Sequence, residues 1–302
     1  MLTLDQLTMH HHAYPEVVER ADYLYRSYIG GETYRDGNYL THYQGEDDHL
    51  YMKRLNSTPL NNYVKTTIDI YCSFLFRELP SRTTSGLERN PLFTEWMKDT
   101  DQEGQGMNSF MKSINNLSMV TGNIWLLVDK PAYAVETAAQ EIALGIRPYV
   151  CAYTPQNVLH WEYERAINGR RELTHIKVVE SNNQDTAKIT CWYTDRIEKY
   201  TVSKDGVGEY DSIIDYQEYP NPLGYIPFVN YAPLPSPVKG VGYSLVEDVA
   251  DIQKYIYNLT SEAEQTIRIS GHPTLVKTAE TNATAGAGSI VNIPTVYNSY
   301  IY

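Results

Sequence analysis

The chain has 302 residues, of which 42% are hydrophobic and 21% are charged, and its net charge is −12. This length accommodates one large or two ordinary domains with a buried core, and the composition excludes a largely disordered chain. No cluster of Lys and Arg offsets the acidic charge, which argues against tight, sequence-specific DNA binding.

The aromatic residues are unusual, with 27 tyrosines against 5 phenylalanines. Tyrosine has an apolar body and a polar tip, which suits half-buried surfaces. The excess therefore indicates either large interfaces or a compositional bias of the lineage.

The cysteines and the apolar segments indicate the cellular setting. Cys72, Cys151 and Cys191 are far apart and form no CxxC pair, a pattern typical of reduced, buried thiols inside a cell. No segment approaches 18 consecutive apolar residues, and the N-terminus lacks an apolar signal region. The sequence therefore predicts neither secretion nor a membrane span.

The first part of the chain is predicted to be mainly helical. Apolar residues at spacings of three and four predict helices over 15–29, about 47–55 and about 59–78. Pro80 is a stop for the third helix, because proline breaks helix hydrogen bonding. The apolar stripe of that helix is Val64, Ile68, Tyr71 and Leu75.

The run KDTDQEGQGMNSF covers residues 98–110. Counted from Asp99, it has acidic residues at positions 1, 3 and 5 of a possible calcium loop. An EF-hand loop also requires a bidentate carboxylate at position 12, and Phe110 stands there. The run is therefore predicted to be a polar linker before a helix that starts near Met107 and ends at Gly122.

The middle of the chain changes to strand patterns. The apolar run 123–131 predicts a buried strand, 134–144 a short helix and 147–164 further strand. Residues 173–231 alternate with period two between turn-rich breaks, which predicts an antiparallel meander. The proline-rich stretch 231–242 predicts an extended arm or hinge.

The most regular element is a predicted helix over 244–269, opened by the capping-box spacing of Ser244 and Glu247. Acidic residues occupy its other faces, and the tail 272–302 is β-prone with a small-residue loop. One face of the helix is apolar for about seven turns: Leu245, Val249, Ile252, Ile256, Leu259, Ala263 and Ile267.

Motifs of common enzymes are missing from the sequence: GxSxG, HExxH, GxGxxG and the P-loop pattern. His160, His175 and His272 are interpreted as isolated, and the run at 10–12 as a solvated stretch or a tag fragment. No catalytic residue, metal site or cofactor is predicted. A sugar-binding groove built on the Tyr- and Trp-rich β region remains an alternative.

Four segments carry a family pattern. In the first, residues 26–80, a helix and a tyrosine-rich loop lead to a Tyr-x-x-Arg motif and a helix ending in Phe-Arg-x-x-Pro. The second, 99–131, has an Asp- and Gly-containing linker, a helix, and a strand ending in Val-Asp-x-Pro. The third is 147–164. The fourth is 223–233, followed by the long helix and 271–276. The motif residues of the first segment are Tyr51, Arg54, Phe76, Arg77 and Pro80.

In this order, the four segments resemble the portal (head–tail connector) proteins of tailed bacteriophages. The resemblance implies an α+β, portal-type protomer. Residues 1–236 would be the wing domain, with N-terminal helices and then the meander. Residues 237–271 would be the hinge and first stem helix, and 272–302 the start of a β-rich clip. The second stem helix, tunnel loop and crown of that family have no counterpart here, so no residue is assigned to the tunnel loop.

The resemblance also implies a function without catalysis. Portal proteins form a ring, usually of twelve subunits, at one vertex of the virion capsid, after assembly in the host cytoplasm. Double-stranded DNA passes through the ring during packaging and ejection without sequence-specific binding. The implied partners are further copies of the chain, the major capsid protein, terminase and tail adaptor proteins. Another phage head or adaptor protein, or a carbohydrate-active enzyme, are the alternatives.

Candidate site residues follow from the charge of the long helix. A channel that lets DNA slide should repel phosphates rather than neutralise them. If the apolar face of the helix packs on neighbouring subunits, Asp248, Asp251 and Glu262 face the channel. The same residues also suit an ordinary solvated helix face, and the sequence leaves both interpretations open.

Overall fold

The structure is a computed structural model that describes residues 1–131 and 137–271. Helices and antiparallel sheets are both present, which confirms the predicted α+β class. Contacts divide the chain into two compact units, one of residues 1–38 and 62–253, the other of residues 39–61 and 254–302. The wing, stem and clip boundaries stay predictions, and the predicted clip, 272–302, lies outside the described residues.

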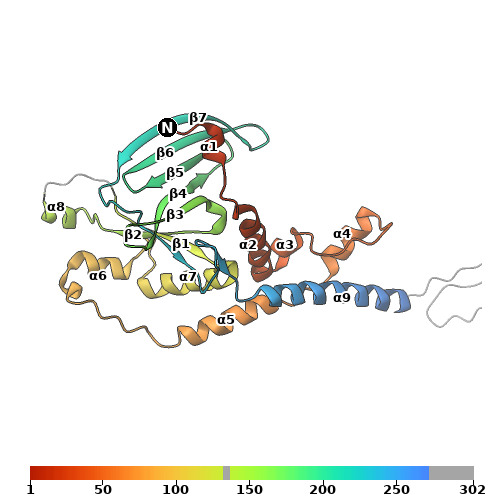
Figure 1. Cartoon of the computed structure of the whole chain (residues 1–302). Coiled ribbons are helices and arrows are strands. Elements are labelled where there is room, and N and C mark those ends of the chain that lie inside the picture. The colour runs from red at the N-terminus through yellow and green to blue at the C-terminus, as the bar shows by residue number, and fades with distance from the viewer. Residues whose placement is uncertain (132–136, 272–302) are drawn as a thin grey trace, which may run out of the picture. The chain divides into compact units, whose positions relative to one another are not determined.

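The first unit contains a five-stranded antiparallel sheet in which the strands follow one another in chain order (Figure 1). The meander predicted over 173–231 is confirmed as far as Pro220, because these strands pair antiparallel in chain order, whereas its last strand, 228–231, belongs to a second sheet. The strands are β3 (Val158–Arg165), β4 (Arg171–Asn182), β5 (Thr186–Tyr193), β6 (Arg196–Lys204) and β7 (Tyr210–Pro220).

A three-stranded antiparallel sheet in the same unit has the order β2–β1–β8. The predicted buried strand 123–131 forms its centre. The strands are β1 (Ile124–Asp129), β2 (Tyr149–Tyr153) and β8 (Phe228–Tyr231). In the proline-rich stretch, β9 (Leu234–Pro235) pairs with β10 (Gly242–Tyr243).

The two larger sheets pack face to face. Trp161, Ile176 and Trp192 of the five-stranded sheet share a hydrophobic cluster with Trp125 and Phe228 of the three-stranded sheet. Burial of such large side chains stabilises the pair by about 1.5–3 kcal/mol for each aliphatic or aromatic group.

Helices pack on the outer faces of the two sheets in this unit, a short one on the five-stranded sheet and two on the three-stranded sheet (Figure 1). Leu7 of α1 (Leu4–Thr8) packs with Ile189 and Tyr200 of the five-stranded sheet. On the three-stranded sheet, Phe110 and Ile114 of α7 pack with β1 and β2. The covering helices there are α6 (Pro91–Lys98) and α7 (Met107–Thr121). The two sheets are therefore packed on each other, with α6 and α7 on one outer face and α1 on part of the other.

Further helices of the first unit form their own cluster. Leu24, Ile68 and Val120 meet Val246 and Ala250 there, all buried. The helices are α2 (Tyr14–Ile29), α5 (Tyr63–Leu75), α7 and the start of α9 (Glu247–Gly271). Shorter pieces are α3 (Gly31–Arg35), α8 (Ala138–Ala143) and the 3-10 turns η1 (Leu87–Arg89) and η2 (Pro155–Asn157).

Some boundaries differ from the predictions. The helix predicted over 59–78 is α5, which begins only after Asn62, whose side chain accepts the N–H of Lys65. The long helix begins at Glu247 rather than at Ser244. The Ser244 hydroxyl accepts the N–H of Val246 and donates to the carbonyl of Met119, so it holds the turn before the helix, and the N–H of Ala250 donates to the carbonyl of Val246.

The acidic loop before α7 is held by its own backbone. Asp99 accepts the N–H of Gly104 and pairs with Arg147 at 2.7 Å. Asp101 accepts the N–H groups of Glu103 and Gln105. Both carboxylates thus accept backbone hydrogen bonds that stabilise the turn. The hydrogen bond from Gly104 lowers the pKa of Asp99. This geometry fits the predicted linker.

Two glycines fix where α9 starts. Gly122 ends α7 with a φ of 93°, and a Cβ on it would lie 2.6 Å from the carbonyl oxygen of Gly242. A Cβ on Gly242 would lie 2.7 Å from Cβ of Ala232. Only residues without a side chain permit this approach. The N–H of Leu245 then donates to Met119, which ties the entry of α9 to the end of α7.

Candidate functional site

The predicted acidic site residues lie on the exposed surface of α9. Asp248, Asp251 and Glu262 are all exposed to solvent. Asp251 accepts a hydrogen bond of 3.1 Å from the hydroxyl of Tyr23, whereas no hydrogen bond is recorded for the side chains of Asp248 and Glu262. Because α9 turns by 100° per residue, the three fall on one side of the helix. Whether that side faces a channel stays a prediction.

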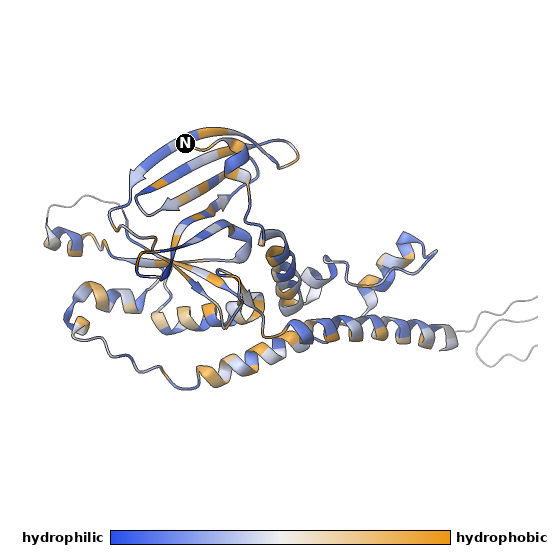
Figure 2. Cartoon of the chain, viewed as in Figure 1, coloured by the Kyte–Doolittle hydropathy of each residue, from blue (hydrophilic) through white to orange (hydrophobic). Residues whose placement is uncertain are grey.

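The predicted apolar face of α9 is a second candidate surface. Most of its members are uncovered, with exposed fractions of 57% for Ile252, 44% for Leu259 and 70% for Ile267. Leu245 and Ala263 are also exposed, whereas Val249 and Ile256 are half-buried. We call these seven residues the α9 stripe; Figure 2 shows apolar and polar residues alternating along the helix. An unburied stripe of this length is unusual on a monomer.

A different face of α9 is the one that the chain buries. In the first unit, Gln253 accepts the N–H of Val64 and donates to the carbonyl of Ser27. In the second unit, Tyr257 donates to the carbonyl of Leu55. Sequence reasoning missed this face because its members are partly polar, although their spacing is helical. They are Val246, Ala250, Gln253, Tyr257 and Ser261.

Arg54 organises the second unit. It lies in α4 (Asp48–Ser57), and its side chain is only 3% exposed. The guanidinium donates to both carboxylate oxygens of Glu46, at 2.9 and 2.6 Å, and to the carbonyl of Thr41 at 2.7 Å. A further bond of 3.1 Å reaches the hydroxyl of Ser261 on α9. Arg54 therefore joins α4, the preceding loop and α9.

Aromatic rings complete the Arg54 site. The guanidinium lies 3.9 Å from the ring centre of Tyr43 and 5.6 Å from that of Tyr51. The Tyr51 hydroxyl donates to the carbonyl of Leu40. The hydrogen bonds from Arg54 lower the pKa of Glu46. Tyr51 and Arg54, which carry part of the family resemblance, thus have a structural role here.

The end of α5 is a further apolar surface. Val64, Ile68 and Cys72 face the helical cluster, because they recur every fourth residue. Tyr71 and Leu75, predicted to share that buried stripe, are instead exposed, so this part of the prediction is wrong. An open pocket on the helix is lined by Thr66, Asp69, Ile70, Ser73, Phe74 and Arg77.

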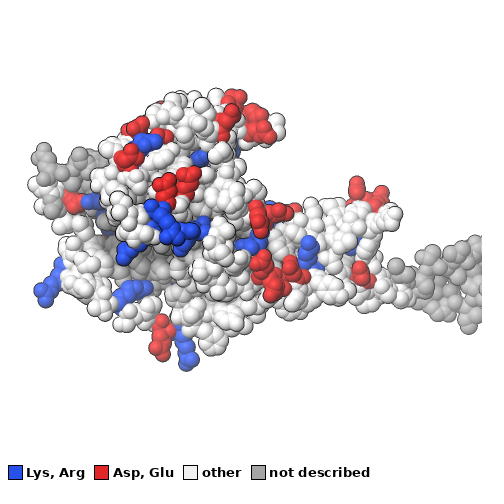
Figure 3. All heavy atoms as spheres, viewed as in Figure 1, with Lys and Arg blue, Asp and Glu red and all other residues white. Residues whose placement is uncertain are grey.

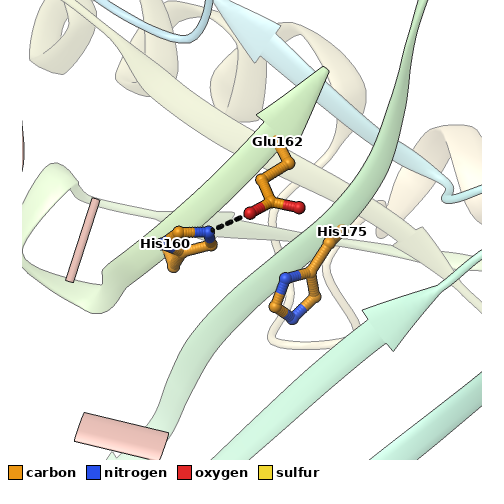
Figure 4. A group of neighbouring side chains, drawn as sticks. All are labelled: His160, Glu162 and His175. Atoms are coloured by element: carbon orange, nitrogen blue, oxygen red, sulfur yellow. Dashed lines mark hydrogen bonds and ion pairs between the residues drawn. The ribbon is translucent and has the colours of Figure 1, made fainter. Parts of the chain in front are cut away.

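The five-stranded sheet contains a cluster that the sequence did not predict. His160 and Glu162 extend from β3, and His175 extends toward them from the neighbouring β4 (Figure 4). Nε2 of His160 lies 2.9 Å from Oε1 of Glu162. One ligand atom from each residue lies within 4.8 Å of the others. The interpretation of His160 and His175 as isolated is therefore wrong; His272 lies outside the described residues.

The N-terminal histidines line an open pocket beside this cluster, together with Trp161 and Arg171. The ring of His11 stacks on Trp161 with ring centres 4.0 Å apart, and the backbone N–H of His11 donates to the carbonyl of Leu159. The prediction of a solvated stretch is therefore wrong for His11. Burial lowers the pKa values of His11 and His175 to about 4, which leaves both rings neutral at pH 7.

The carboxylates give no support to a glycosidase. Among the described residues, Glu198 is the one buried Asp or Glu side chain. Burial alone would raise its pKa, but hydrogen bonds from Arg196 and Tyr200 lower it. Retaining and inverting glycosidases both need two carboxyl groups across a groove, and Glu198 instead is bonded within the sheet.

The cysteines agree with the predicted reduced state, since Cys72, Cys151 and Cys191 are all free thiols. Cys72 and Cys191 are buried as predicted, whereas Cys151 is only half-buried. Burial raises the pKa of Cys151 to about 11 and that of Cys191 to about 12, so neither is a reactive thiolate at neutral pH.

The comparisons give no relatives: no protein-family model matches the chain, and no curated protein matches it either. Acidic and basic side chains are interspersed on the face drawn in Figure 3 rather than gathered into one basic field. None of the helices within 1–131 and 137–271 has the length and apolarity that crossing a bilayer requires.

Proposed function

We propose that this chain is the protomer of a portal-type ring at the capsid vertex of a tailed bacteriophage. In this proposal, double-stranded DNA passes through the ring during packaging and ejection, and terminase and tail adaptors dock on it. The order of the four segments that resemble portal proteins supports this proposal. The α9 stripe is the observation that carries the proposal, because it is the surface that further copies of the chain would cover.

The physical argument concerns what covers Ile252, Leu259 and Ile267. Leaving such side chains in water forfeits about 1.5–3 kcal/mol each relative to burial. The chain buries another face of the same helix, so these three members of the α9 stripe stay exposed within the described residues. A ring places a neighbouring copy against every such helix, and repetition of one contact around a closed symmetry covers all of them.

The acidic side of α9 fits the same arrangement. Asp248 and Glu262 are exposed along one border of the α9 stripe. If the stripe contacts neighbouring copies, these carboxylates are free to face the lumen. Negative charge there repels the phosphate backbone, so DNA passes without the gain in affinity that counterion release provides.

Mass photometry and negative-stain imaging of the purified chain test the proposal. The wild-type chain is expected to form a closed ring of about twelve copies with a hole of duplex width. The double variant Ile252→Glu with Leu259→Glu is expected to give monomers, because it buries charge at each interface. The matched control Ile167→Glu with Val207→Glu changes two exposed apolar residues elsewhere and should leave the ring intact.

Two results would overturn the proposal. A wild-type monomer at all accessible concentrations means that the α9 stripe does not bind further copies. A ring that survives Ile252→Glu with Leu259→Glu means that another surface makes the contact. A closed ring without a hole of duplex width would instead favour a head or adaptor protein that does not conduct DNA.

A further inference from the structure

The cluster on the five-stranded sheet carries an inference independent of ring formation. We infer that His160, Glu162 and His175 form a binding site for a divalent transition-metal ion, with Zn²⁺ as the best match. The sheet places the three side chains together. Glu162 lies directly opposite His175 in the pairing of β3 with β4, and His160 is two residues from Glu162, on the same face.

The distances suit a small ion. Zinc binds imidazole nitrogen and carboxylate oxygen at about 2.0–2.2 Å in tetrahedral geometry, so two ligand atoms on one ion are about 3.3–3.6 Å apart. The three ligand atoms here lie within 4.8 Å of one another, and Nε2 of His160 is already 2.9 Å from Oε1 of Glu162. Small side-chain rotations therefore bring all three onto one centre.

Each imidazole ring has one buried nitrogen atom without a hydrogen-bond partner, on the edge of the ring that faces away from Glu162 (Figure 4). His160 is only 9% exposed, yet its Nδ1 has no hydrogen-bond partner. Nε2 of His175 is also buried without a partner. Because the two nitrogens of an imidazole point in different directions, these outer atoms do not bind an ion at the centre of the cluster. The grouping of the three ligand atoms on one face of the sheet carries the inference.

The kinds of ligand select the ion. Two imidazoles and one carboxylate favour zinc and other transition metals, whereas calcium and magnesium prefer oxygen alone. Glu162 has a half-exposed side chain beside the open pocket, which leaves a fourth position for solvent. His11 is not the fourth ligand in this geometry, because its Nδ1 accepts the N–H of Ala13 and its other nitrogen therefore carries the proton.

Neighbouring groups define the surroundings of the site. Tyr193 on β5 stacks on His175 with ring centres 4.5 Å apart and fixes the plane of the imidazole. Lys177 is opposite His160 on β4, and its positive charge opposes a cation. Its ammonium group is held by the carbonyls of Gln6 and Met9, at 2.7 and 3.0 Å, so it is directed toward the N-terminal segment.

Isothermal titration with Zn²⁺ on the whole chain, followed by visible spectroscopy of the Co²⁺ form, tests the inference. One ion per chain is expected, with the spectrum of a four-coordinate site. Glu162→Gln keeps the shape and removes the charge, and should weaken binding at least about tenfold. His175→Asn should abolish it. Circular dichroism checks that both variants remain folded.

The histidine run provides the matched control. His10→Ala with His12→Ala removes two exposed imidazoles from the same pocket and should leave the affinity for Zn²⁺ unchanged. Loss of binding in this control, with binding retained in Glu162→Gln, would overturn the inference and assign the ion to the N-terminal run. Absence of any binding at millimolar Zn²⁺ would overturn it as well.

Discussion

Arg54 connects several segments in the described part of the second unit. A buried guanidinium is tolerated because its donors reach Glu46, Thr41 and Ser261 and because Tyr43 covers its plane. Breaking such a pair exposes the remaining charge to an apolar environment without compensation. Local stability around α4 therefore depends on one ion pair.

Glu46→Ala is expected to destabilise the second unit by about 3–5 kcal/mol, because it leaves the charge of Arg54 buried and unpaired. Hydrogen exchange of the amides in 39–61 and 254–271 measures the local effect. The exposed residue Glu209 supplies the control, since Glu209→Ala should change stability by less than about 0.5 kcal/mol. Equal exchange rates in the two variants would contradict the structural role of Arg54.

The same pair predicts a pH dependence. The pKa of Glu46 in the folded chain is below its usual 4.5, so the unfolded chain holds more protons between the two values. The stabilisation is complete above pH 4.5 and is lost as the pH falls through the folded-state pKa. Denaturant unfolding at a series of acidic pH values should show a shallower pH slope for Glu46→Gln than for the wild type. Identical slopes would contradict the assignment.

At the scale of elements, the junction of α7 and α9 sets where the long helix begins. Gly122 and Gly242 touch through their backbones, and Leu245 and Ser244 both bond to Met119. Val246, just before α9, and Ala250 in its first turn then join the helical cluster. The start of α9 in the first unit therefore depends on two residues without side chains.

Gly242→Ala is expected to cost about 1–3 kcal/mol, because the added methyl group overlaps Gly122 and Ala232. Thermal unfolding of the whole chain measures the loss. Gly206→Ala is the matched control, since a Cβ there meets nothing within 4 Å. A control as destabilised as Gly242→Ala would mean that the close approach is not what the glycine provides.

At the scale of the whole molecule, the proposed ring and its charge can be separated experimentally. The ring depends on the α9 stripe, whereas DNA repulsion depends on Asp248 and Glu262. Asp251 is less suited to substitution, because it also bonds Tyr23. Charge reversal at the other two residues therefore tests the channel without removing a contact recorded in the structure.

Asp248→Lys with Glu262→Lys is expected to raise the affinity of the assembled ring for duplex DNA at least about tenfold at low salt, because added cations release counterions. Fluorescence anisotropy at increasing salt measures the gain and its salt slope. Glu209→Lys with Asp211→Lys adds the same charge next to and within β7 and should have a smaller effect. Equal gains in the two variants would show that the acids of α9 do not face the DNA.

The sequence by itself determined the α+β class, the meander over β4–β7, the boundaries of α7 and the existence of α9. These features depend on the local spacing of apolar residues and on residues that end helices, such as Gly122, and the sequence shows both directly. Charge and apolar spacing likewise identified the α9 stripe and the acidic residues beside it.

Tertiary structure decided which surfaces are buried and which distant residues meet. Gln253 and Tyr257 are buried although both have polar groups, because backbone groups of other segments form hydrogen bonds with those polar groups. His160, Glu162 and His175 meet only through the register of β3 with β4, which two bulges adjust. Strand register depends on contacts between segments rather than on neighbours in sequence, so the cluster could not be predicted from spacing alone.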